Sequence, residues 1–208
     1  MLKMIYLAKR KPGFSFDGFV RRWRKHGALA IEQPLWRQTL GYVQAEPIRP
    51  QPFVGASEDY DAIACYMVRD GLFTEMTEED ATSSAIMAED ELKTFAEPIP
   101  ATALWVKEER VLPGELGGIT AFLFFNNTAN ARESAQRASA SGGLNRITLN
   151  TRDDGMPRES QTLPYQAVVE LSAASIPALE AALEAVDVIP TSDLAVITRE
   201  AVLWHRMS

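Results

Sequence analysis

Hydrophobic positions recur with two different periods along the first half of the chain, and together they predict six elements. Pro34 should end the first helix, because the residue before a proline is pushed out of the α region. Apolar runs with a period near two residues predict strands at about 2–10, 39–46, 60–69 and 101–110. Stretches with a period near 3.6 residues predict helices at 16–32 and 78–95.

The same order of elements returns in the second half. Strands are predicted at 119–125, 144–150, 164–172 and 194–204, and helices at 128–141 and 176–187. The residues also repeat, since Tyr60-Asp-Ala-Ile-Ala64 lines up with Tyr165-Gln-Ala-Val-Val169, and 103–112 lines up with 194–203. Two matches in the same order favour an internal duplication.

A unit of strand, helix, strand, strand, helix, strand is typical of the ferredoxin-like arrangement, in which both helices cover one face of an antiparallel sheet. The strand at 60–69 is apolar on both sides, so the second face of this sheet must also be buried. Two copies in one chain can bury these faces against each other and close a barrel. We therefore predict an α+β fold with an N-terminal ferredoxin-like repeat at 1–112, a linker at 113–118 and a C-terminal repeat at 119–208.

Composition excludes several classes of protein. The net charge is −7, whereas nucleic-acid-binding proteins normally carry a basic excess, so no nucleic-acid partner is expected. No apolar run approaches the roughly 20 residues of a membrane span, and the first residues lack the features of a signal peptide. A soluble, cytoplasmic protein without a membrane partner is expected. The single cysteine, Cys65, allows no disulfide within the chain.

Candidate chemistry centres on His26, one of only two histidines. It falls on the apolar stripe of the helix at 16–32, where it can act as a general acid or base or can be a hydrogen-bonded core residue. Asp61 and Glu32 are the carboxylates that could orient it. The other histidine, His205, follows Trp204 near the C-terminus and is expected to be a solvated tail residue.

Aromatic residues gather near His26 in the predicted fold. Their side chains either pack the core or line a pocket with hydroxyl donors for a planar apolar molecule. They are Tyr6, Trp23, Trp36, Tyr42 and Tyr66. No glycine-rich phosphate loop or Cys-x-x-Cys motif is present, and two distant histidines make a metal site improbable, so we expect no metal and no cofactor.

The first half carries a distinct set of residues: the opening Lys3–Gly13, then Ser15, Phe19, Trp23 and His26, then Tyr60–Ala64, and Asp90-Glu91 followed by Phe95. On these residues, positions 1–110 resemble the EthD-like family of dimeric α/β-barrel proteins. The second half matches this family in topology only, because Ala138 or Ser139 stands in the approximate place of His26. The resemblance implies an intramolecular dimeric α/β-barrel with one competent and one degenerate half.

The resemblance also implies a small-molecule protein, since the superfamily includes dehydratases, decarboxylases, lactone isomerases and haem-degrading oxygenases, and most members lack a bound cofactor. Our leading hypothesis is a cofactor-independent lyase or isomerase that acts on a small apolar or aromatic metabolite. His26 would be its general acid or base in a dehydration, decarboxylation or isomerisation. The alternatives are a non-catalytic small-molecule-binding or accessory protein of a catabolic pathway and, third, a haem-handling protein. Two such chains could also pair as a homodimer.

Overall fold

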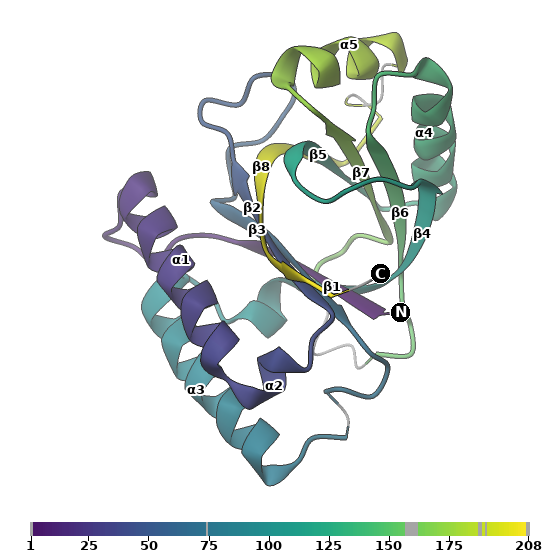
Figure 1. Ribbon diagram of the computed structural model, residues 1–208. Helices are drawn as coiled ribbons and strands as arrows, with labels where there is room; N and C mark the ends of the chain where they lie inside the picture. Colours follow the sequence, from purple (N-terminus) through teal and green to yellow (C-terminus); the bar gives the residue numbers. More distant parts are fainter. Residues whose placement is uncertain (1, 74, 157–161, 187–188, 190, 207–208) are drawn as a thin grey trace.

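The computed structural model describes residues 2–73, 75–156, 162–186, 189 and 191–206. Eight strands form one closed barrel, in which every neighbouring pair is antiparallel (Figure 1). Their order around the barrel is β1-β3-β2-β8-β5-β7-β6-β4. The strands are β1 Leu2–Ala8, β2 Gly41–Pro47, β3 Ala62–Val68, β4 Ala103–Leu112, β5 Gly118–Phe125, β6 Arg146–Arg152, β7 Ala167–Ala173 and β8 Leu194–His205.

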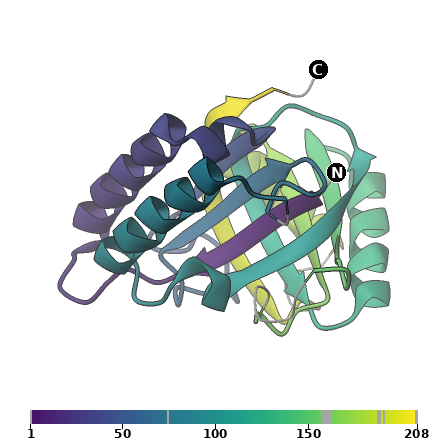
Figure 2. The same cartoon turned by 90° about the horizontal axis from the view of Figure 1, so that it is seen from below.

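Helices cover the outside of the barrel on two opposite sides, α1 to α3 on one and α4 and α5 on the other (Figures 1 and 2). All of the predicted strands and helices are present. The chain adds a short helix that begins at Pro34, because proline fits the first position of a helix as well as it ends the preceding one. The predicted last residue of the final helix, 187, lies outside the described residues. The helices are α1 Phe16–Glu32, α2 Pro34–Arg37, α3 Glu78–Thr94, the 3-10 helix η1 Ile99–Thr102, α4 Thr128–Ser141 and α5 Ile176–Val186.

The two halves are ferredoxin-like units that share one barrel. Strands β4-β1-β3-β2 come from the first half and β8-β5-β7-β6 from the second. The pairs β2·β8 and β4·β6 join the halves, so each half covers the outer edge strands of the other. The predicted fold of two β-α-β-β-α-β units is therefore confirmed.

The barrel interior explains why the strands are apolar on both faces. Alternate strand residues point outward to the helices or inward to a core that both halves share. On β3, for example, Ile63 and Cys65 face this shared core, whereas Ala64 and Tyr66 face the helices. The buried residues of the shared core are Ile5, Leu7, Val43, Ala45, Ile63, Cys65, Met67, Leu104, Val106, Phe122, Phe124, Leu163, Val168 and Val196.

The N-cap of helix α1 determines where the helix begins, and its apolar stripe determines which face is buried. The Ser15 hydroxyl accepts a hydrogen bond from the backbone N–H of Gly18, which satisfies one of the free donors of the first turn. The helix then packs closely against β2 at Gly27, where an added Cβ would lie only 2.7 Å from the side-chain nitrogen of Gln44. This close approach fixes the rotation of α1 and thereby the direction of its buried side chains. Among the described residues, no helix combines the length and apolar character that a membrane crossing requires.

The connection between the halves lies tightly over one end of the barrel. An added Cβ at Gly114 would lie 2.1 Å from the backbone oxygen of Asn145, so no other residue fits there without a shift of the chain. The predicted linker at 113–118 is slightly shorter in the structure, because β4 extends to Leu112 and β5 begins at Gly118.

The turn after α3 is held by a buried carboxylate. Glu91 accepts a hydrogen bond from the backbone N–H of Ile99, at the start of η1, with 3.1 Å between the nitrogen and Oε2. Burial raises the pKa of Glu91 from 4.5 to about 7, although the hydrogen bond opposes this effect. The carboxyl is therefore more easily protonated in the folded chain than in the unfolded one.

The shared core predicts that the first half cannot remain a folded monomer by itself. Residues 1–112 would expose the inner face of a whole sheet and two unpaired edge strands. We expect this fragment to aggregate or to self-associate into a barrel dimer, as measured by light scattering and sedimentation. A soluble, folded monomer would contradict the shared core.

The raised pKa of Glu91 predicts a pH-dependent stability difference from E91Q. The stability that protonation gives is present below the unfolded pKa of 4.5 and is lost as the pH rises through the folded value of about 7. In urea titrations E91Q should match the wild type near pH 4, and its free energy of unfolding should exceed that of the wild type by up to about 3 kcal/mol at pH 8. The exposed residue Glu97 supplies the control E97Q, which should not change with pH relative to the wild type. Equal pH profiles for the wild type and E91Q would refute the assignment.

Candidate functional site

His26 lies between α1 and α3, where its imidazole is only 2% exposed. Its Nδ1 is 2.8 Å from Oδ2 of Asp90 on α3. The other carboxylate oxygen of Asp90 pairs with Arg22, at 2.5 Å from Nη2. The ring of Phe95 packs edge-on against the imidazole, with 5.3 Å between the ring centroids. His26 is thus held by one carboxylate and covered by one aromatic ring.

The protonation state of this pair follows from burial. Burial lowers the pKa of His26 below 6.5, and the hydrogen bond to Asp90 only partly offsets this effect. Burial also disfavours the Asp90 carboxylate, but hydrogen bonds from Arg22 and His26 outweigh it and hold the pKa of Asp90 below its usual range. A neutral imidazole beside a carboxylate donates its one N–H to that carboxylate. His26 therefore has a free lone pair on Nε2, which is the form that a general base requires.

Asp61 does not hold His26, so the expectation that it orients the histidine is wrong. It stands immediately before β3, where its backbone N–H pairs with the end of β1, and this position turns its carboxylate toward Arg10 and Arg49. Their guanidinium nitrogens lie 2.8 Å and 3.1 Å from Oδ1 of Asp61. The other candidate, Glu32, is exposed at the end of α1.

The predicted aromatic residues come together in one layer between the first-half sheet and its helices. Trp23 donates from its indole nitrogen to the hydroxyl of Tyr6 over 3.0 Å, and that hydroxyl lies 3.4 Å from the hydroxyl of Tyr42. The rings of Tyr42 and Tyr66 stack with 4.1 Å between centroids. Burial raises the pKa of all three tyrosines, which keeps their hydroxyls protonated.

Trp36 belongs to the same layer, and both it and Trp105 on β4 have a buried indole N–H. That of Trp105 has no hydrogen-bond partner among the described residues. That of Trp36 has none of good geometry, although it lies near enough to the Tyr66 hydroxyl to act on the pKa of that group. The two side chains are only 8% and 4% exposed. Phe73 packs edge-on against both rings, with centroid distances of 6.1 Å and 5.5 Å. Phe73 also lines a surface pocket of about 360 Å³, together with Leu2, Val68, Leu72 and Met156.

A continuous series of ring contacts links this pocket to His26. Centroid distances between successive rings range from 5.3 to 6.4 Å. The series runs through His26, Phe95, Tyr6, Tyr66, Trp36 and Phe73. The histidine and the pocket therefore lie toward the two ends of one aromatic layer.

The corresponding layer of the second half is different. Helix α4 buries Ala131, Ala135 and Ala138 against its sheet, and α5 buries aliphatic side chains such as Leu179. The cluster also contains Phe125, with Phe53 packed against it, but among the described residues it has no histidine and no pair of stacked rings.

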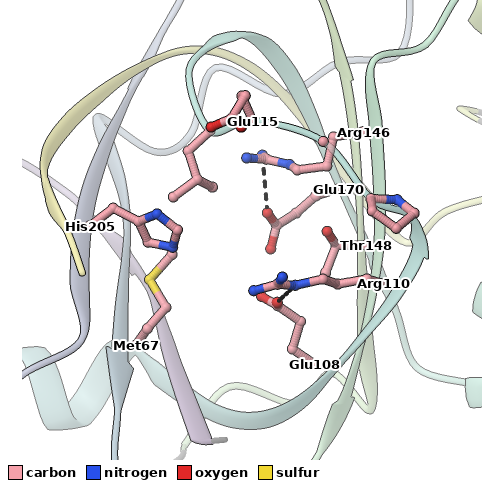
Figure 3. Close-up of a pocket in the computed structure, with 11 residues that line it drawn as sticks. Met67, Glu108, Arg110, Glu115, Arg146, Thr148, Glu170 and His205 are labelled. Carbon is pink, nitrogen blue, oxygen red and sulfur yellow. Dashed lines mark hydrogen bonds and ion pairs between the residues drawn. The ribbon is translucent and has the colours of Figure 1, made fainter. Parts of the chain in front are cut away.

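A second pocket, of about 440 Å³, opens at the barrel end that the linker crosses (Figure 3). Strand residues Glu108, Arg110, Arg146 and Glu170 form its charged wall, and His205 borders it. His205 is exposed, as its place near the C-terminus predicts, but its ring also forms part of this pocket.

Buried ion pairs continue from this wall into the barrel. Lys3 is 1% exposed, and its ammonium lies 3.1 Å from Glu108 and also pairs with Glu170. Arg146 pairs through Nη2 with Glu200 at 2.6 Å and with Glu170 at 3.4 Å. Sequence analysis missed this network. Its signal was present, because Lys3 and Glu170 stand at inward positions of apolar strands, where a charge must find a partner.

The described residues contain no cluster of three or more side chains suited to a metal ion. The charged groups at the barrel end form ion pairs with one another.

Solved structures similar to this chain share its fold at low sequence identity. No protein-family model and no curated protein sequence matches the chain. A Lactobacillus acidophilus protein that is provisionally described as a monooxygenase has a TM-score of 0.52 and 9% identity, over 97% of this chain and 92% of the other. An anthrone oxidase-like protein has a TM-score of 0.54 and 8% identity, over 100% and 95%.

A third protein, provisionally described as a chlorite dismutase, has a TM-score of 0.57 and 10% identity, over 96% of this chain and 94% of the other. These matches extend over nearly the whole chain, so they include both repeats and the closed barrel. The chain therefore has the fold of the dimeric α/β-barrel proteins, with both ferredoxin-like units in one polypeptide.

Proposed function

We propose that the chain is a small-molecule enzyme whose substrate is planar, largely apolar and carries a carbonyl or phenolic oxygen. The substrate binds in the aromatic layer of the first half. The observation that carries this proposal is the buried indole N–H of Trp105, which has no partner among the described residues, together with that of Trp36, which has none of good geometry. A buried donor without a partner costs about 1–3 kcal/mol, so an acceptor oxygen that enters the layer recovers this free energy.

Phe73 is the side chain that a ligand must displace. It lies against both indoles and lines the neighbouring pocket, so a change of its rotamer connects the pocket with the two N–H groups. The stacked rings of Tyr42 and Tyr66 then offer a flat surface to a planar molecule. Anthrone, in the name of one similar structure, is a planar aromatic ketone and belongs to this class of molecule.

His26 supplies proton transfer in this proposal. At its end of the layer, Nε2 can take a proton from a carbon next to a carbonyl, while a tyrosine hydroxyl polarises the oxygen. Dehydration and isomerisation use such a step without a cofactor. In a decarboxylation His26 in its protonated form would instead give a proton to the carbon that loses CO2. This role agrees with the resemblance of the first half to EthD-like proteins. Because the pKa of His26 is lowered, activity should fall only when the pH drops below the usual histidine range.

A non-catalytic binding protein is the second candidate function. The observation that favours it is the cover over His26, whose imidazole is 2% exposed beneath the ring of Phe95. In that case the histidine ties α1 to α3 through Asp90, and the aromatic layer only binds the ligand.

Haem handling does not fit the residues present. An axial histidine needs an imidazole nitrogen that faces a space as wide as a porphyrin. His26 has the carboxylate partner that a ligating histidine often has, but the ring of Phe95 lies directly against its imidazole. His205 borders a pocket whose wall includes Glu108 and Glu170. We therefore propose no haem-dependent step.

Replacing either Trp36 or Trp105 by phenylalanine should separate ligand binding from stability. W36F and W105F each remove a donor without a well-placed partner and keep an aromatic ring, so the melting temperature should change little. The affinity for a planar ketone such as anthrone should weaken roughly 5- to 30-fold. Quenching of the remaining tryptophan fluorescence measures this affinity.

The matched control is W204F. The indole nitrogen of Trp204 already donates to the hydroxyl of Thr39 over 3.1 Å, so this variant should keep the wild-type affinity for the ketone. Unchanged affinity in both W36F and W105F would place the ligand elsewhere and refute the proposed binding mode.

His26→Asn tests the catalytic role. Asparagine can still donate to Asp90, so the melting temperature should stay close to that of the wild type, whereas turnover of a bound planar ketone should fall at least about 100-fold. Ligand affinity should be retained, and H205N should behave as the wild type. Full turnover in H26N would remove His26 from the reaction. Tight binding without turnover in the wild type would instead support the binding-protein alternative.

A further inference from the structure

Arg146 has hydrogen-bond donors that its ion pairs do not use. The residue is 4% exposed, and its ion pairs with Glu170 and Glu200 are both made through Nη2. Its Nε and Nη1 are buried without a hydrogen-bond partner among the described residues. Arg146 lines the barrel-end pocket, and Figure 3 shows its side chain extending from the wall into this space. Nε and Nη1 have almost no exposed surface of their own, so an acceptor that enters through the adjacent cavity reaches them once the side chains over them move aside.

The charges around Arg146 are already balanced. Burial alone would lower the pKa of Lys3, but the carboxylates beside it, Glu170 first, outweigh this effect and keep the ammonium charged. Glu115 is exposed to solvent at the rim of the pocket. The network contains three cations and three carboxylates, namely Lys3, Arg110 and Arg146 with Glu108, Glu170 and Glu200.

This balance determines which ligand fits. A bound anion or cation would add a charge that no group of the network compensates, and burying an uncompensated charge is costly. An uncharged acceptor satisfies the free N–H groups of Arg146 without disturbing the ion pairs. We propose that the barrel end is a second small-molecule site, which binds an uncharged polar molecule through a carbonyl or amide oxygen held by Arg146.

The remaining walls suit the rest of such a molecule. Thr148 contributes a side chain with a hydroxyl, while Met67, Pro113 and Leu116 contribute apolar surface. A volume of about 440 Å³ lies within the range of small-molecule sites and accommodates a compact ring. The ligand is therefore a small cyclic or branched amide, lactam or ketone.

The site is separate from the aromatic layer. Residues that reach the barrel-end pocket, such as Met67, point to the barrel interior, whereas Tyr66 and the aromatic layer lie on the outer face of the same sheet. The sheet itself separates the two sites. The inference therefore does not depend on the function proposed above, and each can fail alone.

The experiment uses the neutral lactam 2-piperidone as the probe, with sodium acetate and butylammonium chloride as charged probes of similar size at the same ionic strength. The readout is the side-chain Nε–Hε signal of Arg146 in nitrogen-15 spectra of the intact protein, assigned with R146K. We expect a saturable shift of this signal with 2-piperidone and none with either charged probe.

Leu116→Trp provides a variant that leaves the ion pairs unaltered. Leu116 is half-buried on the linker, so a larger side chain there fills the pocket and should weaken binding of 2-piperidone at least 10-fold. The control V54W places the same side chain at a fully exposed position and should bind as the wild type. W36F should also retain lactam binding, since it alters only the aromatic layer.

Three results would overturn the proposal. The first is a lactam effect that never saturates or that spreads over the surface, which indicates non-specific contact only. The second is equal lactam affinity in L116W and the wild type, provided that L116W is folded. The third is tighter binding of acetate or butylammonium than of 2-piperidone, which would replace the uncharged ligand by an ion.

Discussion

Burial of both faces of the strands, complete in β3 and β7 and partial toward the ends of β4 and β8, is the constraint on which the rest of this molecule depends. The helices of each half cover the outer face of its sheet, and only the sheet of the other half covers the inner face. The strand pairs β2·β8 and β4·β6 close the remaining edges. The hydrophobic effect and backbone hydrogen bonding thus favour the same closed arrangement, and neither half satisfies them alone.

This constraint creates two environments from one set of strands. Strand β1 shows the division, because Lys3 and Ile5 point into the barrel while Tyr6 points to the helices. The outer layer of the first half is aromatic and keeps its hydroxyls neutral, whereas one end of the interior is ionic. A sheet that is one residue thick separates two chemically different spaces, so each can recognise its own class of molecule.

The fold could be predicted almost entirely from the sequence, since it depends on periodicity and on a repeated order of elements that local patterns express. The site could be predicted only in part. The apolar stripe of α1 correctly predicts that His26 is on the buried side of the helix. The carboxylate that binds His26 could not be predicted, because it depends on how α1 packs against α3. That packing selects Asp90, which lies 64 positions away in the chain, over Asp61. The partner of Lys3 is even less accessible to pattern analysis, because Glu170 belongs to the other half.

Covalent linkage of the two units also removes a restriction of symmetry. In a dimer of identical chains every inward residue occurs twice, so a lysine on one unit always comes with a second lysine on the other. Here the alignment of the two repeats makes Cys65 equivalent to Glu170. The strand registers Ile5↔Cys65 and Phe122↔Glu170 then make Lys3 equivalent to Thr120. The tandem chain therefore has Lys3 where its second half has Thr120, and Glu170 where its first half has Cys65, so the barrel holds this ion pair once. A symmetric pair of chains would hold the same pair twice, once on each side of the twofold axis, and could not confine it to one side of the interior.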